Sequence, residues 1–286
     1  MHKINKLSLC LLLKVYDSTK SYKIRKIIKQ YLEGKDVEIK YKNVRFKVRT
    51  ASSIEFLLIF KEYNETNIIA IIQYLARRSY SFIDIGANIG IHSLMASKAN
   101  PDIKIYSFEP EPSNYNRFTE NIRLNSFANN VTTFNLGLRD EIGSKILNIN
   151  GANNKGKHSL KRNFGSENTQ MPISIERLDS FKNLILPVNS LLIKIDVEGF
   201  EMEVLDGAVK FLKPVDEIVI IIELLEEINT LQGCRQIYDR LKFENFDVCY
   251  KVTENGIHSV TEYSSSGDYL FLKENESKRI FNEFLV

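Results

Sequence analysis

Features that would place this 286-residue chain among disulfide-rich, disordered or membrane proteins are scarce. Its three cysteines, Cys10, Cys234 and Cys249, form no C-x-x-C pair and have no histidine pair nearby, so neither a disulfide framework nor a zinc site is expected. There is no Pro-rich or low-complexity block, and 43% hydrophobic with 26% charged residues is ordinary for a globular protein. The length suits one large domain, or a domain with an N-terminal extension.

Long hydrophobic runs are also absent. The most apolar stretch near the start, Leu7 to Leu13, is interrupted by Ser8 and Cys10 and followed by Lys14, so it is too short to cross a bilayer. It also lacks the small residues of a signal-peptide cleavage site. These features predict a cytoplasmic protein.

Positive charge is concentrated near the N-terminus, although the formal net charge is only +3. Residues 1–50 contain 14 Lys and Arg against 4 Asp and Glu, whereas the remainder contains 25 against 32. This asymmetry could draw the N-terminus to an anionic membrane surface, an acidic glycan or a nucleic acid, or could be a solvated basic face. Nucleic acid is the less expected partner, because the basic residues lack an aromatic-rich binding signature.

The hydrophobic pattern predicts two parts. Residues 4–33 have helical spacing, and residues 37–49 alternate around Lys42 and Asn43 as a β-hairpin does. We therefore expect a cap of helices and a hairpin over residues 1–53, followed by a main domain over residues 54–286 that starts with a helix reaching about residue 78.

The main domain alternates short apolar runs with helical segments. This alternation predicts a parallel sheet with helices on both faces, whose ligands gather at the carboxyl ends of the strands. The strands are expected at 81–85, 103–108, 131–136, 191–195 and 217–223, and the helices at about 90–98, 113–125 and 199–212.

Two further runs, 246–252 and 268–273, follow a helix expected at 235–243 and are joined by a loop too short for a helical crossover. The last strand should therefore be antiparallel. Residues 139–190 form an excursion with an expected strand pair at 145–149 and 172–175, and residues 150–170 between them are expected to form a mobile loop near the mouth of the site.

The first strand ends in a glycine turn whose details favour S-adenosylmethionine over a dinucleotide. Gly86 and Gly90 allow a tight turn, but Asn88 stands where a dinucleotide site has its second glycine. Asp84 would repel a pyrophosphate, yet it suits the ammonium and sulfonium groups of S-adenosylmethionine. Asn88 is expected to hydrogen-bond the methionyl part.

The second strand ends at Glu109 and Pro110. A carboxylate at this position can accept hydrogen bonds from both ribose hydroxyls, and the proline fixes the exit of the strand. For Asp84 and Glu109 the alternative is that each merely ends a strand or caps a helix. Together they complete a predicted cofactor site of Asp84, Gly86, Asn88, Gly90, Glu109 and Pro110.

Acidic residues follow the fourth and fifth strands. Asp196 comes directly after a buried run and is the first candidate to position or deprotonate a hydroxyl acceptor, with Glu198 and Glu223 as partners. Alternatively, Asp196 and Glu223 could hold a divalent ion, although a metal is not the favoured reading. His92 could serve as a base, or could pack beneath the cofactor.

Three motifs, taken together, resemble the FkbM family of S-adenosylmethionine-dependent methyltransferases. They are F-I-D-I-G-A-N-I-G at 82–90, S-F-E-P at 107–110 and L-I-K-I-D-V-E-G-F-E-M-E-V-L-D-G-A at 192–208, and the resemblance extends to D-Y-L-F-L-K at 268–273. It implies a class I methyltransferase fold, an α/β Rossmann-like fold with a seven-stranded, mostly parallel sheet and a reversed last strand. It also implies O-methylation of a small-molecule or glycan hydroxyl, with no required metal.

Two other functions remain open at this stage. A catalytically silent module that binds S-adenosylmethionine is opposed by the acidic residues at both the cofactor and the acceptor edges. An NAD-dependent oxidoreductase is opposed by Asp84 and Asn88 and by the lack of a Tyr-x-x-x-Lys pair. The acceptor and the oligomeric state are not predicted.

Overall fold

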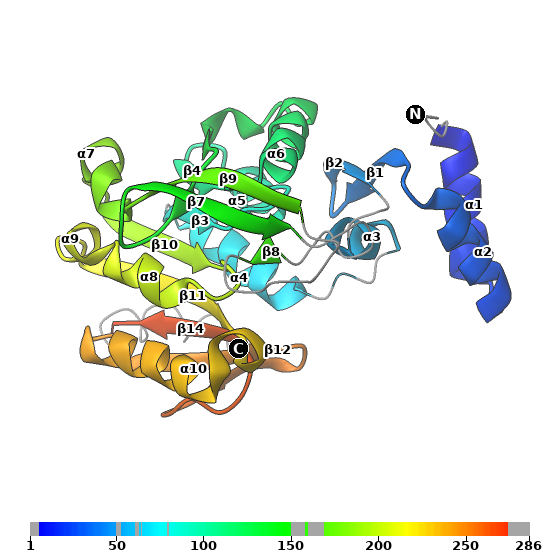
Figure 1. Cartoon of the computed structure of the whole chain (residues 1–286). Coiled ribbons are helices and arrows are strands. Elements are labelled where there is room, and N and C mark those ends of the chain that lie inside the picture. Colours follow the sequence, from blue (N-terminus) through cyan, green and yellow to red (C-terminus); the bar gives the residue numbers. More distant parts are fainter. Residues whose placement is uncertain are drawn as a thin grey trace.

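The computed structural model describes residues 6–49, 53–60, 63, 65–78, 80–149, 158–159 and 169–273. Its centre is an eight-stranded sheet in the order β13-β12-β14-β11-β10-β3-β4-β5. Figure 1 shows the part of this sheet from β12 to β4. The strands are β3 (Ser81–Ile85), β4 (Ile105–Phe108), β5 (Val131–Phe134), β10 (Ser190–Ile195), β11 (Glu217–Leu224), β12 (Val248–Thr253), β13 (Gly256–Ser259) and β14 (Gly267–Leu272).

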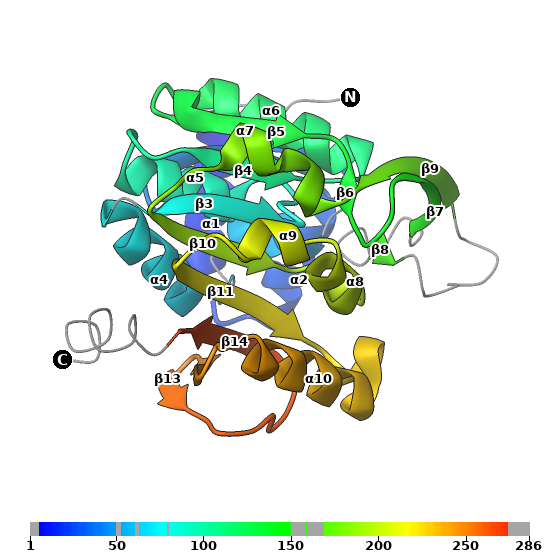
Figure 2. The same ribbon diagram turned by 90° about the vertical axis from the view of Figure 1, so that its left-hand side faces the viewer.

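The strand directions confirm the predicted fold class. Strands β11, β10, β3, β4 and β5 are parallel neighbours (Figure 2). Strand β14 lies between β11 and β12 and is antiparallel to both. The apolar run of β11 is buried on both faces, as parallel strands require. Strand β13 forms a hairpin with β12 and adds an edge strand to the predicted seven.

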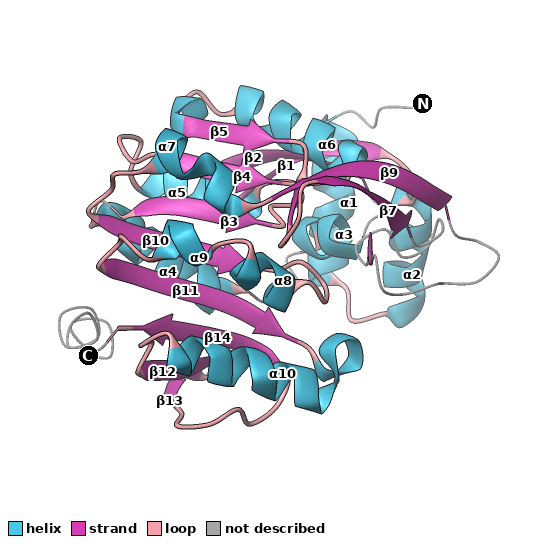
Figure 3. Cartoon of the chain, turned by 60° about the vertical axis from the view of Figure 1, so that its left-hand side comes forward, coloured by secondary structure: helices cyan, strands magenta, loops and turns pink. Residues whose placement is uncertain are grey.

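Helices cover both faces of this sheet (Figure 3). Leu192 packs with α4 (Thr66–Arg77) and α5 (Ile91–Ala99), whereas its neighbour Ile193 packs with α8 (Glu201–Asp206), α9 (Val209–Leu212) and α10 (Glu226–Phe243). The change of partner follows from the alternation of side chains along a strand. Helix α6 (Pro112–Leu124) lies beside α5, and a short turn of helix, α7 (Lys182–Ile185), precedes β10.

Three predicted helices differ from the observed ones. The helix expected up to residue 78 is interrupted, giving α3 (Ser53–Ile59) and α4. The helix expected at 199–212 is divided at Gly207, where a Cβ would lie 2.0 Å from the carbonyl oxygen of Arg139. Helix α10 begins nine residues before the predicted start at 235 and is kinked at Thr230, whose φ is 63°.

The N-terminal cap contains α1 (Lys6–Ser18), α2 (Tyr22–Leu32), β1 (Asp36–Tyr41) and β2 (Val44–Arg49). The hairpin is confirmed: Tyr41 pairs with Val44, and Lys42 and Asn43 have the positive φ angles that a two-residue turn needs.

The hairpin is attached to α6 through the side chains of two asparagines. Asn121 Oδ1 accepts the backbone N–H of Lys47 at 2.7 Å, and Asn125 both accepts from the N–H of Arg45 and donates to its carbonyl. Residues of the cap and of the main domain also pack together in one buried hydrophobic cluster. It includes Leu32 and Phe46 from the cap and Phe118 from the main domain. The segments on either side of the predicted boundary at residue 53 therefore pack against each other. The division of the chain into a cap and a main domain stays a prediction.

The excursion between β5 and β10 forms a second sheet, in the order β6-β9-β7-β8. Its strands are β6 (Gly137–Leu138), β7 (Gly143–Ile149), β8 (His158–Ser159) and β9 (Thr169–Glu176). The predicted strand pair is present as β7 and β9, which run antiparallel. Most of the loop expected at 150–170 lies outside the described residues. Within the described part of the chain, no helix combines the length and apolar character needed to cross a membrane.

Candidate functional site

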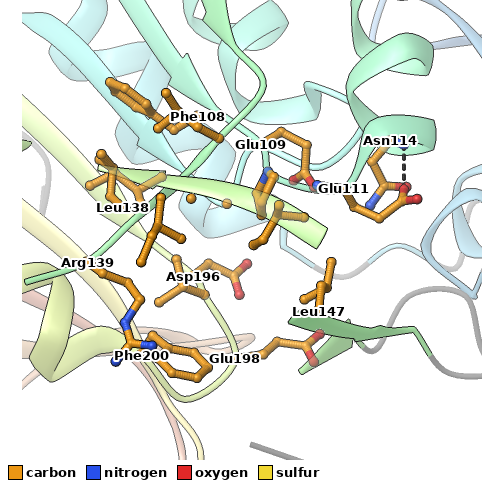
Figure 4. Close-up of a pocket in the computed structure, with 18 of the residues that line it drawn as sticks. Phe108, Glu109, Glu111, Asn114, Leu138, Arg139, Leu147, Asp196, Glu198 and Phe200 are labelled. Atoms are coloured by element: carbon orange, nitrogen blue, oxygen red, sulfur yellow. Dashed lines mark hydrogen bonds between the residues drawn. The ribbon is translucent and has the colours of Figure 1, made fainter. Parts of the chain in front are cut away.

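A pocket with about 850 Å³ of empty space, part of it continuous with solvent, lies at the carboxyl ends of β3, β4 and β10. This is the edge at which ligands of parallel sheets bind. Strands β7 and β9 of the second sheet contribute Leu147, Ile173 and Ile175 to its lining. Figure 4 shows Leu147 at this pocket. The other lining residues are Ile85, Gly86, Asn88, Phe108, Glu109, Pro110, Glu111, Asn114, Leu136, Gly137, Leu138, Arg139, Asp196, Val197, Glu198 and Phe200.

Gly86 brings two strand ends together. Its φ of 81° lies in the left-handed region, and a Cβ at this position would be 1.8 Å from the backbone oxygen of Asp196. The N–H of Gly86 donates to the carbonyl of Phe108 at 2.9 Å. Glycine is therefore required both by the turn and by the close approach of β10.

Glu109 is held by backbone donors at the pocket wall. Its Oε2 accepts the N–H of Asn88 at 2.8 Å, and its Oε1 accepts the N–H of Glu111 at 2.9 Å. Each oxygen keeps further acceptor capacity, so the carboxylate can still take two hydroxyl donors. Burial raises the pKa of Glu109 to about 8 despite these hydrogen bonds. Asn88 and Pro110 line the pocket beside it, and their predicted contacts with the cofactor stay predictions.

Asp84 and Gly90 are not among the residues that line the pocket, and their predicted contacts with the cofactor stay predictions. Asp84 is fully buried on the sheet face covered by α4 and α5, where it accepts a 2.5 Å hydrogen bond from Ser93. Gly90 starts α5, and a Cβ there would lie 2.0 Å from the ring of Phe118. Gly90 is thus explained by helix packing, and Asp84 by the alternation of side chains along β3.

Asp196 lines the pocket and is paired with a buried lysine that sequence reasoning missed. Lys194 Nζ lies 2.7 Å from Asp196 Oδ2, and the lysine side chain is only 3% exposed, against 30% for Asp196. Burial opposes the charge of Lys194, but Asp196, Glu65 and Asp84 raise its pKa above the ordinary value. The signal was available, because a lysine inside a core strand is costly unless it has a partner.

The other two predicted catalytic residues are separated. Glu198 lines the pocket, with a φ of 50° in the left-handed region. Glu223 is not part of the pocket lining; it is paired in register with Asp268 on β14. Burial, followed by the charges of Asp196 and Asp268, raises the pKa of Glu223. Among the described residues, no three His, Cys, Asp or Glu side chains are grouped as a metal site would be.

His92 also lies outside the pocket lining, so the base role considered for it is not supported by its position. Its Nε2 is 2.9 Å from Glu65 Oε2, in the segment that leads into α4. Burial opposes the charge of Glu65, but His92 makes the largest contribution to lowering the Glu65 pKa to about 2. The ion pair thus links α5 to the start of α4.

The raised pKa of Glu223 predicts a pH-dependent effect on stability. The folded state binds this proton more tightly than the unfolded state, whose carboxyl titrates near 4.5, so wild-type stability falls as pH rises above that value. Glu223→Gln carries no such proton, and its advantage in Tm should grow from pH 5 to pH 9. We expect roughly 2–8 °C at the upper end, as about 1–2 kcal/mol gives for a large domain.

The measurement is a thermal melt at several pH values. The exposed Glu262→Gln is the control, and its Tm difference from wild type should stay constant with pH. A constant difference for Glu223→Gln would show that this carboxyl is ionised in the folded protein.

Residues 84–248, more than half of the chain, match the methyltransferase FkbM domain family. Methyltransferase sdnD from Sordaria araneosa is 29% identical over an alignment of 153 residues that covers 44% of this chain and 59% of that protein. Hexuronic acid methyltransferase AglP from Haloferax volcanii is 27% identical over 173 residues, 60% of this chain and 68% of its own length. The chain therefore spans less than two thirds of sdnD and slightly more than two thirds of AglP.

Solved structures with a similar arrangement include the FkbM methyltransferase from Methylobacillus flagellatus. It has a TM-score of 0.42 and 14% identity, over 93% of this chain and 58% of that one. The O-methyltransferase from Bacillus cereus in complex with SAH has a TM-score of 0.44 and 13% identity, over 93% and 97%. On the family match over residues 84–248, the chain belongs to the FkbM methyltransferases.

Proposed function

We propose that this chain transfers the methyl group of S-adenosylmethionine to a hydroxyl oxygen of a sugar, a glycan or a natural product. The observation that carries the cofactor assignment is Glu109, whose two carboxylate oxygens are fixed by backbone N–H groups beside the pocket. A rigid double acceptor of this kind matches the two adjacent hydroxyls of a ribose.

The rest of the lining fits the remaining parts of the cofactor. Leu138, Ile173 and Ile175 offer an apolar surface for a flat adenine ring. Asp196 and Glu198 give the other side of the pocket an acidic character that favours the positive sulfonium. When bound, S-adenosylmethionine supplies a methyl group that is open to in-line attack.

The chemical step assigned to the protein is the handling of the acceptor proton. During the transfer the hydroxyl proton must leave the acceptor oxygen, and we assign Asp196 as the group that would accept it. Lys194 Nζ, 2.7 Å from Asp196 Oδ2, holds this carboxylate in one orientation. The missing side chain of Gly86 allows the turn after β3 to lie against the backbone of Asp196.

The class of acceptor is inferred from the family and from one relative. AglP from Haloferax volcanii is named as a hexuronic acid methyltransferase, which supports a sugar acceptor for this chain. Hexuronic acids and hexoses are therefore the first compounds to screen, with transfer of a labelled methyl group as the readout.

Binding of S-adenosylhomocysteine by isothermal titration tests the cofactor assignment. The titration is done at pH 9, above the Glu109 pKa of about 8, where this carboxyl is ionised. There Glu109→Gln should weaken binding about 10- to 100-fold, because a charged acceptor of two hydroxyls is lost. The exposed Glu262→Gln is the control and should bind as wild type does. Unchanged affinity in Glu109→Gln, or NAD binding of comparable strength, would contradict the assignment.

A further inference from the structure

Helix α2 presents an uncovered apolar stripe. Ile28 and Leu32 face the core, at 4% and 0% exposure, whereas Ile24, Ile27 and Tyr31 are 42%, 63% and 54% exposed. These three exposed residues lie along one side of the helix, because they are spaced as i, i+3 and i+7. Figure 1 shows α1 and α2 at one end of the molecule, away from the central sheet.

The same helix is strongly basic. Residues 20–29 contain five Lys and Arg, and residues 18–32 contain no Asp or Glu. Lys20, Lys23 and Lys26 are exposed, and the ammonium of Lys35 lies 3.4 Å from the centre of the Tyr31 ring. Positive charge thus surrounds the apolar stripe without neutralising acids in that stretch.

We propose that the outer face of α2 docks on an anionic lipid membrane. A membrane interface offers the two complements this face needs, an apolar layer for Ile24, Ile27 and Tyr31 and negative headgroups for the lysines. The helix lies flat in the interface and does not span the bilayer.

Two other occupants fit the face less well. A second copy of the chain in a twofold dimer would place the face against itself and bring like charges together. A nucleic acid would match the lysines, but its phosphates would give the exposed isoleucines no apolar partner.

Vesicle flotation of the full chain tests the proposal. Wild type should bind vesicles of phosphatidylcholine with about 30% phosphatidylglycerol, bind pure phosphatidylcholine at least tenfold more weakly, and lose affinity as salt is raised. Ile27→Gln with Tyr31→Gln removes the apolar contribution, and Lys23→Gln with Lys26→Gln removes the charge contribution. Each pair should weaken binding to the anionic vesicles by about tenfold or more.

Matched controls come from other exposed positions. Ile142 is 63% exposed, the same as Ile27, and Lys210 and Lys213 are exposed and three residues apart, like Lys23 and Lys26. Ile142→Gln and the Lys210→Gln, Lys213→Gln pair should leave vesicle binding unchanged. Circular dichroism confirms that each variant is folded.

Three outcomes would overturn the proposal. They are wild type that does not float with anionic vesicles, α2 variants that bind as well as the controls, and a dimer in light scattering that Ile27→Gln dissociates. The proposal is independent of the methyl-transfer reaction, since lipid binding is measured without cofactor or acceptor.

Discussion

Asp196→Asn should lower the rate of methyl transfer by about 10²- to 10⁴-fold and leave the affinity for S-adenosylhomocysteine close to that of wild type. Asparagine keeps the size and polarity of the side chain but cannot accept the acceptor proton. The cofactor contacts proposed for Glu109 and the Gly86 turn do not depend on that charge. The rate is measured with labelled S-adenosylmethionine on the acceptor found by screening, and the affinity by titration.

The variant also leaves Lys194 without its charged partner, which needs a separate control. Loss of one member of a buried pair costs about 3–5 kcal/mol, so Asp196→Asn should also unfold at a lower temperature. Adding Lys194→Met removes the unpaired cation and should restore much of the stability, yet the double variant should remain inactive. The exposed Asp102→Asn should match wild type in both measurements.

These variants separate a chemical role from a structural one. If activity returns together with stability in the double variant, Asp196 acts only as a partner of Lys194. If Asp196→Asn is fully active, the acceptor assignment is wrong, while the cofactor assignment is still judged by the Glu109 titration.

Gly86→Ala should abolish cofactor binding and destabilise the fold strongly. The added Cβ would lie 1.8 Å from the backbone oxygen of Asp196 and 2.9 Å from its carbonyl carbon, so the end of β10 must move away from β3. The left-handed φ adds about 1–2 kcal/mol, and the backbone clash brings the expected total to more than about 3 kcal/mol. Chemical denaturation and S-adenosylhomocysteine titration measure the two effects.

Gly34→Ala is the matched control for backbone conformation. Gly34 has a φ of 71°, close to the 81° of Gly86, but a Cβ there would have no neighbour within 4 Å. Gly34→Ala should therefore lower the free energy of unfolding by the conformational contribution alone, about 1–2 kcal/mol, and cofactor binding should be retained. Equal effects of the two substitutions would mean that the contact between the turn and β10 is unimportant.

The two acidic residues at the ends of β10 and β11, Asp196 and Glu223, have different surroundings. Asp196 has a cation 2.7 Å away and partial access to the pocket. Glu223 is half-buried beside two other carboxyls, and its pKa is raised. Only the first carboxyl reaches the pocket, which is why we propose the acceptor role for Asp196, whereas the part predicted for Glu223 in catalysis stays a prediction.

Several features of the protein could be predicted from the sequence because they depend on local patterns. The apolar runs predicted each strand of the parallel sheet to within a few residues, and the short loop before 268–273 predicted the reversed strand. The hairpin at Lys42 and Asn43 follows from alternation and turn chemistry, which are also local. The positions of Gly86, Glu109 and Asp196 at one edge follow from the parallel order of their strands.

The sequence by itself therefore determined which strand ends meet, while the tertiary structure alone decided which side chains there face the pocket. A residue near the end of a strand points to one face or the other by alternation, and this directs Asp84 toward α5 instead of toward the ligand edge. The contacts of His92 with Glu65 and of Gly90 with Phe118, and the charges of Glu65 and Asp84 near Lys194, involve other strands and helices, and no local sequence pattern predicts them. Packing in three dimensions assigns those contacts, because each depends on atoms brought together only when the sheet is complete.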